Sequence, residues 1–259
     1  QNDEGGASSY DAKLNFLNAV TEEGAPLCYV AVDKDRQLLY GANYHKGEVN
    51  VYHIKEDGSL DAAAAVYHDE ETGPHKNQNT AHVHYTDLTP DNRLVVCDLG
   101  TDHVQTYDVD QSGNLTEVAA YVTQPGCGPR HLVFHPQEDI AYLFGELDNT
   151  VAVLAYNRED GSFSLLQTIS TVPDDFTGES AGAAIRISND GKFLYASNRG
   201  HNSIVAYQIS EDGKSLETIQ FISTEGDGPR DFNLSPENDY VVCGNQNTDN
   251  LSLYRRDAA

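Results

Sequence analysis

The chain has 259 residues, with 41 acidic against 16 basic side chains and a formal net charge of −25. A surface this negative repels nucleic acid and anionic membranes, so neither is expected as a partner, although a small anionic substrate remains compatible. No apolar run approaches the roughly 20 residues of a membrane span. The length allows one large all-β domain with a sizeable core.

In chain order, segment 1–20 comes first and contains two strand-like runs, GGASSYDA and KLNFLNAV. They are expected to form the third and fourth strands of an incomplete repeat. Five segments that share one pattern follow, and they begin at Leu27, Val83, Arg130, Ala183 and Arg230. Each copy predicts an inner strand, a turn rich in Pro, Asp and Asn, an apolar second strand and a third strand near a Tyr. An Asp-Gly or Ser-Gly turn then leads to a more polar fourth strand.

The landmark tyrosines recur at intervals of 55, 49, 51 and 47 residues and are Tyr52, Tyr107, Tyr156, Tyr207 and Tyr254. Four short antiparallel strands in about 50 residues are typical of a β-propeller blade. We therefore expect a single all-β domain over residues 1–259, with about five and a half blades visible. Because a propeller closes into a ring to hide its strand edges, seven blades would need roughly 80 to 90 further residues. The absence of any Met, together with a start at Gln1, also indicates an incomplete chain.

The four cysteines are widely spaced and form no CxxC pair: Cys28, Cys97, Cys127 and Cys243. This pattern fits neither a zinc site nor a dense disulfide framework. Reduced thiols in a cytoplasmic protein are the expected state.

In a propeller blade, the start of the first strand and the end of the second strand lie at the same face. Asn and Asp recur where the second strands end, and most of these are predicted to be turn and hydrogen-bonding residues. The charged residues that break the repeat at these places are His84, Arg130, Glu146, Arg199 and Arg230. Because they differ from blade to blade, they are the candidates for function.

These five residues suit the hydrolysis of a lactone. A His or Glu can move protons to and from water, and an Arg can stabilise the developing oxyanion. The arginine fork also matches phosphate or carboxylate. We predict His84, Arg130 and Glu146 as catalytic residues. The predicted substrate-binding residues are Arg199, Arg230, Asn198 and Asn245. The alternative reading is that the arginines only pair with acidic side chains between blades.

Metal and covalent chemistry have less support. His82 and His84 could face the same side of a strand, but no third ligand is evident, so no metal site is predicted. His68 and His75 are expected to be solvated in a polar loop. There is no GxSxG motif and no cysteine with an obvious histidine partner, so no nucleophile is assigned.

Three motifs resemble the propeller-type lactonase family, which includes bacterial 6-phosphogluconolactonase and carboxy-cis,cis-muconate cyclase. They are H-x5-PDNR from His84, GPRH-x-VFHP around Arg130, and the Glu146 that follows sixteen residues later. The resemblance covers about residues 25–257 and implies a seven-bladed propeller. It also implies catalytic roles for these three residues, with a later family arginine at Arg199 or Arg230. The Gly before Glu146 departs from the polar residue expected there.

The resemblance implies hydrolysis of 6-phosphogluconolactone in the pentose phosphate pathway, without metal or organic cofactor. A muconate-type cyclase or another sugar lactonase remains an alternative that uses the same residues. A second alternative is a non-catalytic propeller that binds a protein or ligand, which would predict exposed aromatic residues at the face. The sequence does not decide the oligomeric state.

Overall fold

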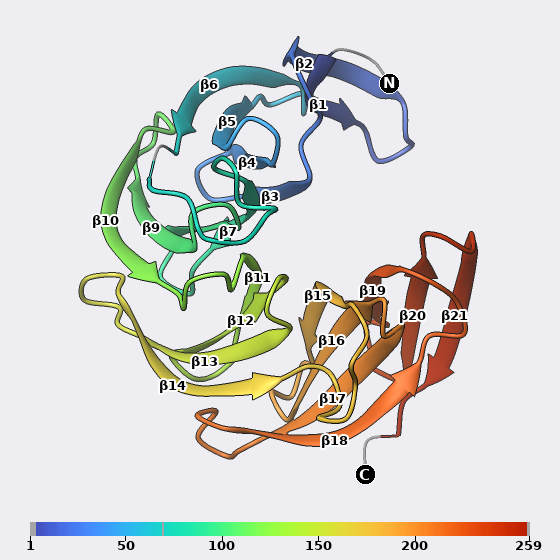
Figure 1. The fold of residues 1–259 in the computed structure, drawn as a ribbon. Helices are drawn as coiled ribbons and strands as arrows, with labels where there is room; N and C mark the ends of the chain where they lie inside the picture. The colour runs from blue at the N-terminus through green and yellow to red at the C-terminus, as the bar shows by residue number, and fades with distance from the viewer. Residues whose placement is uncertain (1–3, 69, 258–259) are drawn as a thin grey trace. The chain divides into compact units, whose positions relative to one another are not determined.

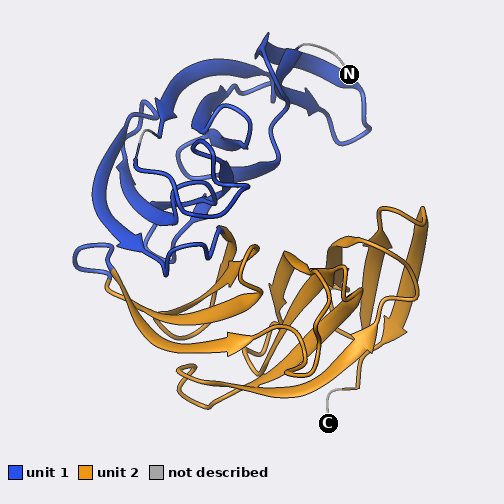
Figure 2. Cartoon of the chain, in the orientation of Figure 1, with its two compact units in different colours: residues 1–128, 158–162 blue, residues 129–157, 163–259 orange. Residues whose placement is uncertain are grey.

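The computed structural model describes residues 4–68 and 70–257, which form 21 β-strands and no α-helix (Figure 1). No helix in this part of the chain could span a membrane. The strands group into six antiparallel sheets, and the chain divides into two compact units (Figure 2). The first unit comprises residues 1–128 and 158–162, and the second comprises residues 129–157 and 163–259.

The first unit holds one two-stranded and two four-stranded sheets. The two-stranded sheet pairs β1 (Glu4–Tyr10) with β2 (Phe16–Glu23). The next sheet follows chain order: β3 (Tyr29–Asp33), β4 (Leu38–Asn43), β5 (Glu48–Ile54) and β6 (Leu60–Tyr67). The third does the same: β7 (Val83–Leu88), β8 (Leu94–Asp98), β9 (His103–Val109) and β10 (Leu115–Val122). The incomplete first repeat is thereby confirmed as two strands.

The second unit holds two four-stranded sheets and one three-stranded sheet. The first contains β11 (Pro129–Phe134), β12 (Ile140–Gly145), β13 (Thr150–Tyr156) and β14 (Phe163–Ser170). The second contains β15 (Ala181–Ile187), β16 (Phe193–Arg199), β17 (Ser203–Ile209) and β18 (Leu216–Ser223). The last contains β19 (Pro229–Leu234), β20 (Tyr240–Asn245) and β21 (Asn250–Arg255).

The hairpin turns between third and fourth strands depend on glycines with a left-handed backbone. Gly113 has a φ of 81° and Gly213 a φ of 71°, a conformation that side chains disfavour. The Asp110 carboxylate accepts backbone N–H bonds from residues Ser112 and Asn114 across the first of these turns. The turns predicted from Asp-Gly and Ser-Gly therefore form where the sequence placed them.

Consecutive sheets within each unit pack face to face through apolar side chains. Tyr40 and Tyr107 belong to the core between the β3–β6 and β7–β10 sheets. Tyr142 and Tyr207 occupy the matching core between the β11–β14 and β15–β18 sheets. These sheets, with strands in chain order and cores between neighbours, are the blades of an all-β propeller.

Candidate active site

Three of the predicted site residues occupy one irregular position in their blades. The pairing of the first strand with the second shifts by one residue in β7, β11 and β19. The residues left outside the regular ladder are His84, Arg130 and Arg230. A bulge leaves a residue unpaired and re-aims its side chain, and bulges are over-represented beside active sites. Three of the five residues that break the sequence repeat are thus placed by a backbone irregularity shared among blades.

The strand register corrects the alignment of Glu146. The sequence placed it with the Asn and Asp residues that end the second strands. The ladder between β12 and β13 ends at Gly145, whereas the ladder between β16 and β17 ends at Asn198. Glu146 therefore matches Arg199, one residue beyond the ladder. The Gly noted before Glu146 occupies the position that Asn holds in the next blade.

Arg130, Glu146 and Arg199 form one ion-paired group in the second unit. Arg130 Nε donates to Glu146 Oε2 at 2.8 Å, and Arg199 Nη2 lies 2.9 Å from Glu146 Oε1. The arginines are also held by backbone carbonyls, because Arg130 Nη1 donates to Ala183 O and Arg199 Nη2 donates to Gly182 O. One carboxylate therefore fixes two guanidinium groups that come from neighbouring blades.

The group carries a net positive charge in a strongly negative chain. The side chain of Arg130 is 3% exposed, that of Glu146 is 16% exposed and that of Arg199 is 21% exposed. Arg199 Nε is buried and has no hydrogen-bond partner among the described residues. A buried donor without an acceptor costs about 1 to 3 kcal/mol, so a ligand oxygen at this position would be favourable. The arrangement suits an anionic group.

Arg230 does not belong to this group. It is exposed, and no hydrogen bond or ion pair given by the described residues joins it to Glu146. It lines an open hollow of about 360 Å³ together with Asp231, Asn245 and Gln246. The geometry therefore distinguishes the two arginines that the sequence left equivalent.

The two predicted asparagines have hydrogen-bonding roles in the scaffold. Asn198 is fully buried, and its amide donates to Thr171 O at 2.6 Å while its oxygen accepts from Thr171 Oγ1 at 2.7 Å. Asn245 is 3% exposed and donates to Thr224 O at 2.8 Å. These bonds link the end of one blade to the second strand of the next, which matches the turn and hydrogen-bonding role expected for the recurring Asn.

His84 lies in the first unit, where the ring of Tyr44 packs against it. It is 5% exposed, and the ring of Tyr44 meets it edge-on at 5.8 Å between centroids. The same tyrosine stacks on His82 at 4.2 Å, and Cys28 Sγ lies 3.5 Å from His84 O. Sequence reasoning missed Tyr44. The signal that finds it is its place directly after the second strand, the same place that Glu146 and Arg199 hold.

The possible His82–His84 metal pair gains no third ligand in the part of the chain that the structure describes. His82 instead bonds through its ring nitrogens to Tyr44 O at 2.9 Å and Asn79 Oδ1 at 3.2 Å. Among the described residues, the one group of three potential metal ligands is His68, Glu70 and Asp98. The expectation for His68 was wrong, because it is 7% exposed and not solvated.

A family model and several known proteins match almost the whole of this chain. A family model described as "Lactonase, 7-bladed beta-propeller" matches residues 1–259. A 6-phosphogluconolactonase of Bacillus subtilis is 41% identical over 260 residues, covering 98% of this chain and 74% of that protein. An uncharacterized protein of Lactococcus lactis is 54% identical over 256 residues, covering 98% of this chain and 75% of that protein.

Solved structures of related proteins have the same fold as this chain. A protein from Lactobacillus plantarum has a TM-score of 0.96 and 48% identity, covering all of this chain and 76% of that chain. The periplasmic gluconolactonase PpgL of Pseudomonas aeruginosa has a TM-score of 0.89 and 31% identity, covering 96% of this chain and 72% of that one. By the family model and these relatives, the chain belongs to the lactonase family of seven-bladed β-propellers.

Proposed function

We propose that this protein hydrolyses 6-phosphogluconolactone to 6-phosphogluconate. The observation that carries the proposal is the Arg130–Glu146–Arg199 group, a largely buried cationic cluster in a chain of net charge −25. The name of the Bacillus subtilis relative supports the phosphorylated lactone as substrate. A cytoplasmic location and a place in the pentose phosphate pathway belong to the same proposal, with no cofactor assigned.

Lactone hydrolysis develops negative charge on the carbonyl oxygen when water attacks the carbonyl carbon. The ring C–O bond then breaks, and the ring oxygen leaves with a proton. A fixed cationic donor at the developing oxyanion lowers this barrier because it needs no reorganisation during the reaction. Arg130 suits that role, since Glu146 and the Ala183 carbonyl hold its guanidinium in place.

Glu146 is assigned the task of positioning both arginines. Each of its carboxylate oxygens already contacts a guanidinium group, at 2.8 Å and 2.9 Å. His84 is assigned the proton transfers, in accordance with the role that the family resemblance implies. A histidine suits both the removal of a proton from water and its delivery to the leaving oxygen, because its ordinary pKa lies near neutrality.

Arg199 is the arginine that we assign to the substrate phosphate. It contacts Glu146, whereas Arg230 is exposed in a separate hollow. Arg199 also retains the buried Nε donor described above. The predicted substrate contact of Arg230 is kept as the alternative that the experiment separates.

The test compares kcat/KM for 6-phosphogluconolactone and for unphosphorylated gluconolactone in the wild type, Arg199→Lys and Arg230→Lys. We expect the wild type to prefer the phosphorylated lactone, and Arg199→Lys to lose most of that preference, because lysine cannot replace a bidentate fork. Arg230→Lys should retain it. A loss of preference in Arg230→Lys alone would instead assign the phosphate contact to Arg230. No acceleration of either lactone over buffer would refute the proposed hydrolysis and favour a cyclase or a binding module.

A further inference from the structure

Neighbouring blades of the second unit are joined by a neutral clasp. Thr171 follows the fourth strand of one blade, and Asn198 is the last residue of the next blade's second strand that pairs with its third strand. Thr171 Oγ1 donates to Asn198 Oδ1 at 2.7 Å, and Asn198 Nδ2 donates back to Thr171 O at 2.6 Å. The next junction repeats the second bond, from Asn245 to Thr224 O at 2.8 Å. Threonine and asparagine complete this junction without charge.

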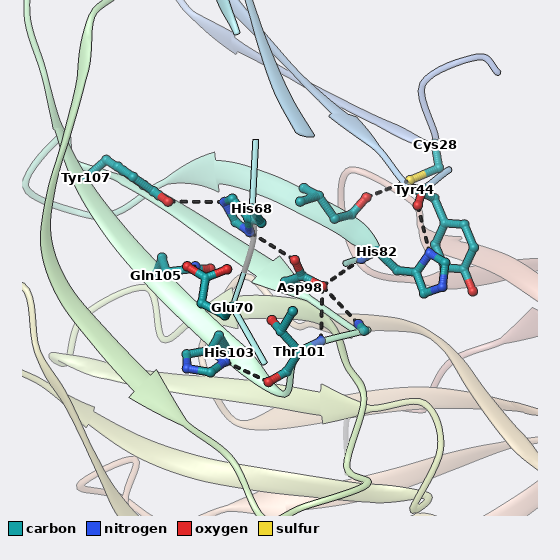
Figure 3. A network of polar contacts seen from close by, with 12 residues as sticks. Cys28, Tyr44, His68, Glu70, His82, Asp98, Thr101, His103, Gln105 and Tyr107 are labelled. Carbon is teal, nitrogen blue, oxygen red and sulfur yellow. Dashed lines mark hydrogen bonds and ion pairs between the residues drawn. The ribbon is translucent and has the colours of Figure 1, made fainter. Parts of the chain in front are cut away.

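In the first unit the same two positions hold His68 and Asp98. The backbone N–H of His68 donates to Gly47 O at 2.9 Å, just as that of Thr171 donates to Asn149 O. His68 Nδ1 lies 3.0 Å from Asp98 Oδ2, and its Nε2 lies 3.1 Å from the hydroxyl of Tyr107 (Figure 3). A histidine and a carboxylate, both of which can bind metals, therefore replace the neutral clasp at this junction of the first unit.

A second carboxylate joins the pair. One ligand atom from each of His68, Glu70 and Asp98 lies within 4.8 Å of the other two. Gln105 Nε2 donates to Glu70 Oε1 at 2.7 Å, which places the amide beside the same carboxylate (Figure 3). Two carboxylates with one imidazole leave negative charge in a largely buried place, because only Glu70 is half-buried, and such charge is costly unless a cation compensates it.

Three buried oxygens around this group have no hydrogen-bond partner among the described residues. They are Glu70 Oε2, Gln105 Oε1 and Thr101 Oγ1. Gln105 is fully buried and Thr101 is 2% exposed, so bulk water does not satisfy them. Unpaired buried acceptors are rare in folded proteins, and several together indicate a bound ion or water. At the neutral clasps, Asn245 Oδ1 and the nearby Asn149 Oδ1 are also buried without a partner, but no carboxylate lies among them.

We propose that His68, Glu70 and Asp98 bind a divalent metal ion, with Mn²⁺ as the best match. Carboxylate and amide oxygens suit Mg²⁺, Ca²⁺ and Mn²⁺, whereas an imidazole nitrogen favours the transition metals, so Mn²⁺ satisfies both preferences. His68 binds through Nδ1, and its Nε2–H then donates to the Tyr107 oxygen, the second contact that metal-bound histidines usually make. Gln105 supplies a further neutral oxygen.

The proposed ion is structural and is separate from lactone hydrolysis. It joins the residue after β6 to the end of β8, where the two junctions of the second unit use Thr and Asn. Asp98 Oδ1 already accepts backbone N–H bonds from His82 and Gly100, so the carboxylate is fixed before any ion binds. An ion here would stabilise the junction between the two four-stranded blades of the first unit.

The experiment titrates Mn²⁺ into chelator-treated protein and follows the electron paramagnetic resonance signal of the free ion, together with the unfolding temperature. We expect one Mn²⁺ per chain, and at saturation an unfolding temperature higher by about 5 to 10 °C. The double variant His68→Thr/Asp98→Asn rebuilds the neutral clasp of the second unit, so it should fold without binding. Glu70→Gln should bind at least about tenfold more weakly. The exposed Glu56→Gln is the matched control and should bind like the wild type.

Two outcomes would overturn the proposal. One is the absence of saturable Mn²⁺ binding up to millimolar concentration in the wild type, which would leave His68 and Asp98 as a simple ion pair. The other is unchanged binding in His68→Thr/Asp98→Asn, which would place the ion elsewhere. Neither outcome depends on lactonase activity.

Discussion

Replacement of Glu146 by glutamine tests whether this carboxylate fixes the two arginines. Gln keeps the shape of the side chain and one acceptor oxygen, but it removes the charge between Arg130 and Arg199. Removing one partner of a buried ion pair costs about 3 to 5 kcal/mol, because the remaining charge stays buried. Arg130 is 3% exposed, so that cost applies to it. The amide oxygen of the new Gln can still accept a hydrogen bond, which favours a value of about 3 kcal/mol.

We therefore expect Glu146→Gln to destabilise the protein by about 3 kcal/mol, which lowers the unfolding temperature by about 6 to 12 °C for a chain of this size. Thermal and urea unfolding followed by circular dichroism measure both quantities. The control is Glu211→Gln, an exposed carboxylate in the same unit, which should change stability by less than about 0.5 kcal/mol. Equal stability of Glu146→Gln and the control would refute the ion-paired geometry.

Three further predictions concern proton transfer, the thiols and the acid limit of stability. His84→Gln should lower kcat for lactone hydrolysis by about 10² to 10⁴, as measured in stopped assays; unchanged kcat would exclude His84 as the proton-transfer residue. A thiol reagent at pH 8 should label the exposed Cys28 before Cys97, because burial raises the pKa of the Cys97 thiol well above its ordinary value; peptide mapping that finds Cys97 first would contradict this. Burial raises the pKa of Asp33, but the backbone and side-chain hydrogen bonds from Arg36 outweigh it and set the pKa below 3.8. The stabilisation from Asp33 is therefore present above its unfolded pKa and lost as pH falls through the lower folded pKa. Wild type and Asp33→Asn should accordingly converge in stability only in acid, and a constant difference down to pH 2 would contradict this.

The blade pattern could be predicted from the sequence because every repeat shows the same order of strands and turns. Alternating apolar residues, the landmark tyrosines and the Gly turns all carry the same period, so an error in one blade is corrected by the others. The strands of the partial first repeat were predicted on the same basis and are present as β1 and β2. The expectation of one domain over residues 1–259 stays a prediction beside the two compact units.

The candidate site was predicted only in part, since side-chain direction depends on register. The bulges that release His84, Arg130 and Arg230 from their ladders leave no mark in the apolar pattern. The one-residue offset of Glu146 was invisible for the same reason. A shift of one residue in a strand moves every side chain to the opposite face of the sheet. An alignment of the repeats therefore does not determine which side chains contact one another.

Burial was the second quantity that the sequence did not supply. His68 stands in a polar stretch, which indicated a solvated loop, yet the fold covers it with residues far along the chain. Its partner Asp98 is 30 residues away and Tyr107 is 39 residues away. Contacts at that separation are set by blade packing and have no local signal. The cluster with Glu70 could therefore be found only from the folded chain.

The most direct test of the central claim is kcat/KM for 6-phosphogluconolactone in the wild type and in Arg130→Lys, each corrected for spontaneous hydrolysis. Lysine keeps the positive charge but cannot reach both Glu146 and the Ala183 carbonyl as the guanidinium does. The account predicts that the wild type accelerates hydrolysis and that Arg130→Lys loses about 10² to 10³ of that rate while remaining folded. A folded Arg130→Lys protein with wild-type kcat/KM would contradict the assignment of this arginine to the reaction.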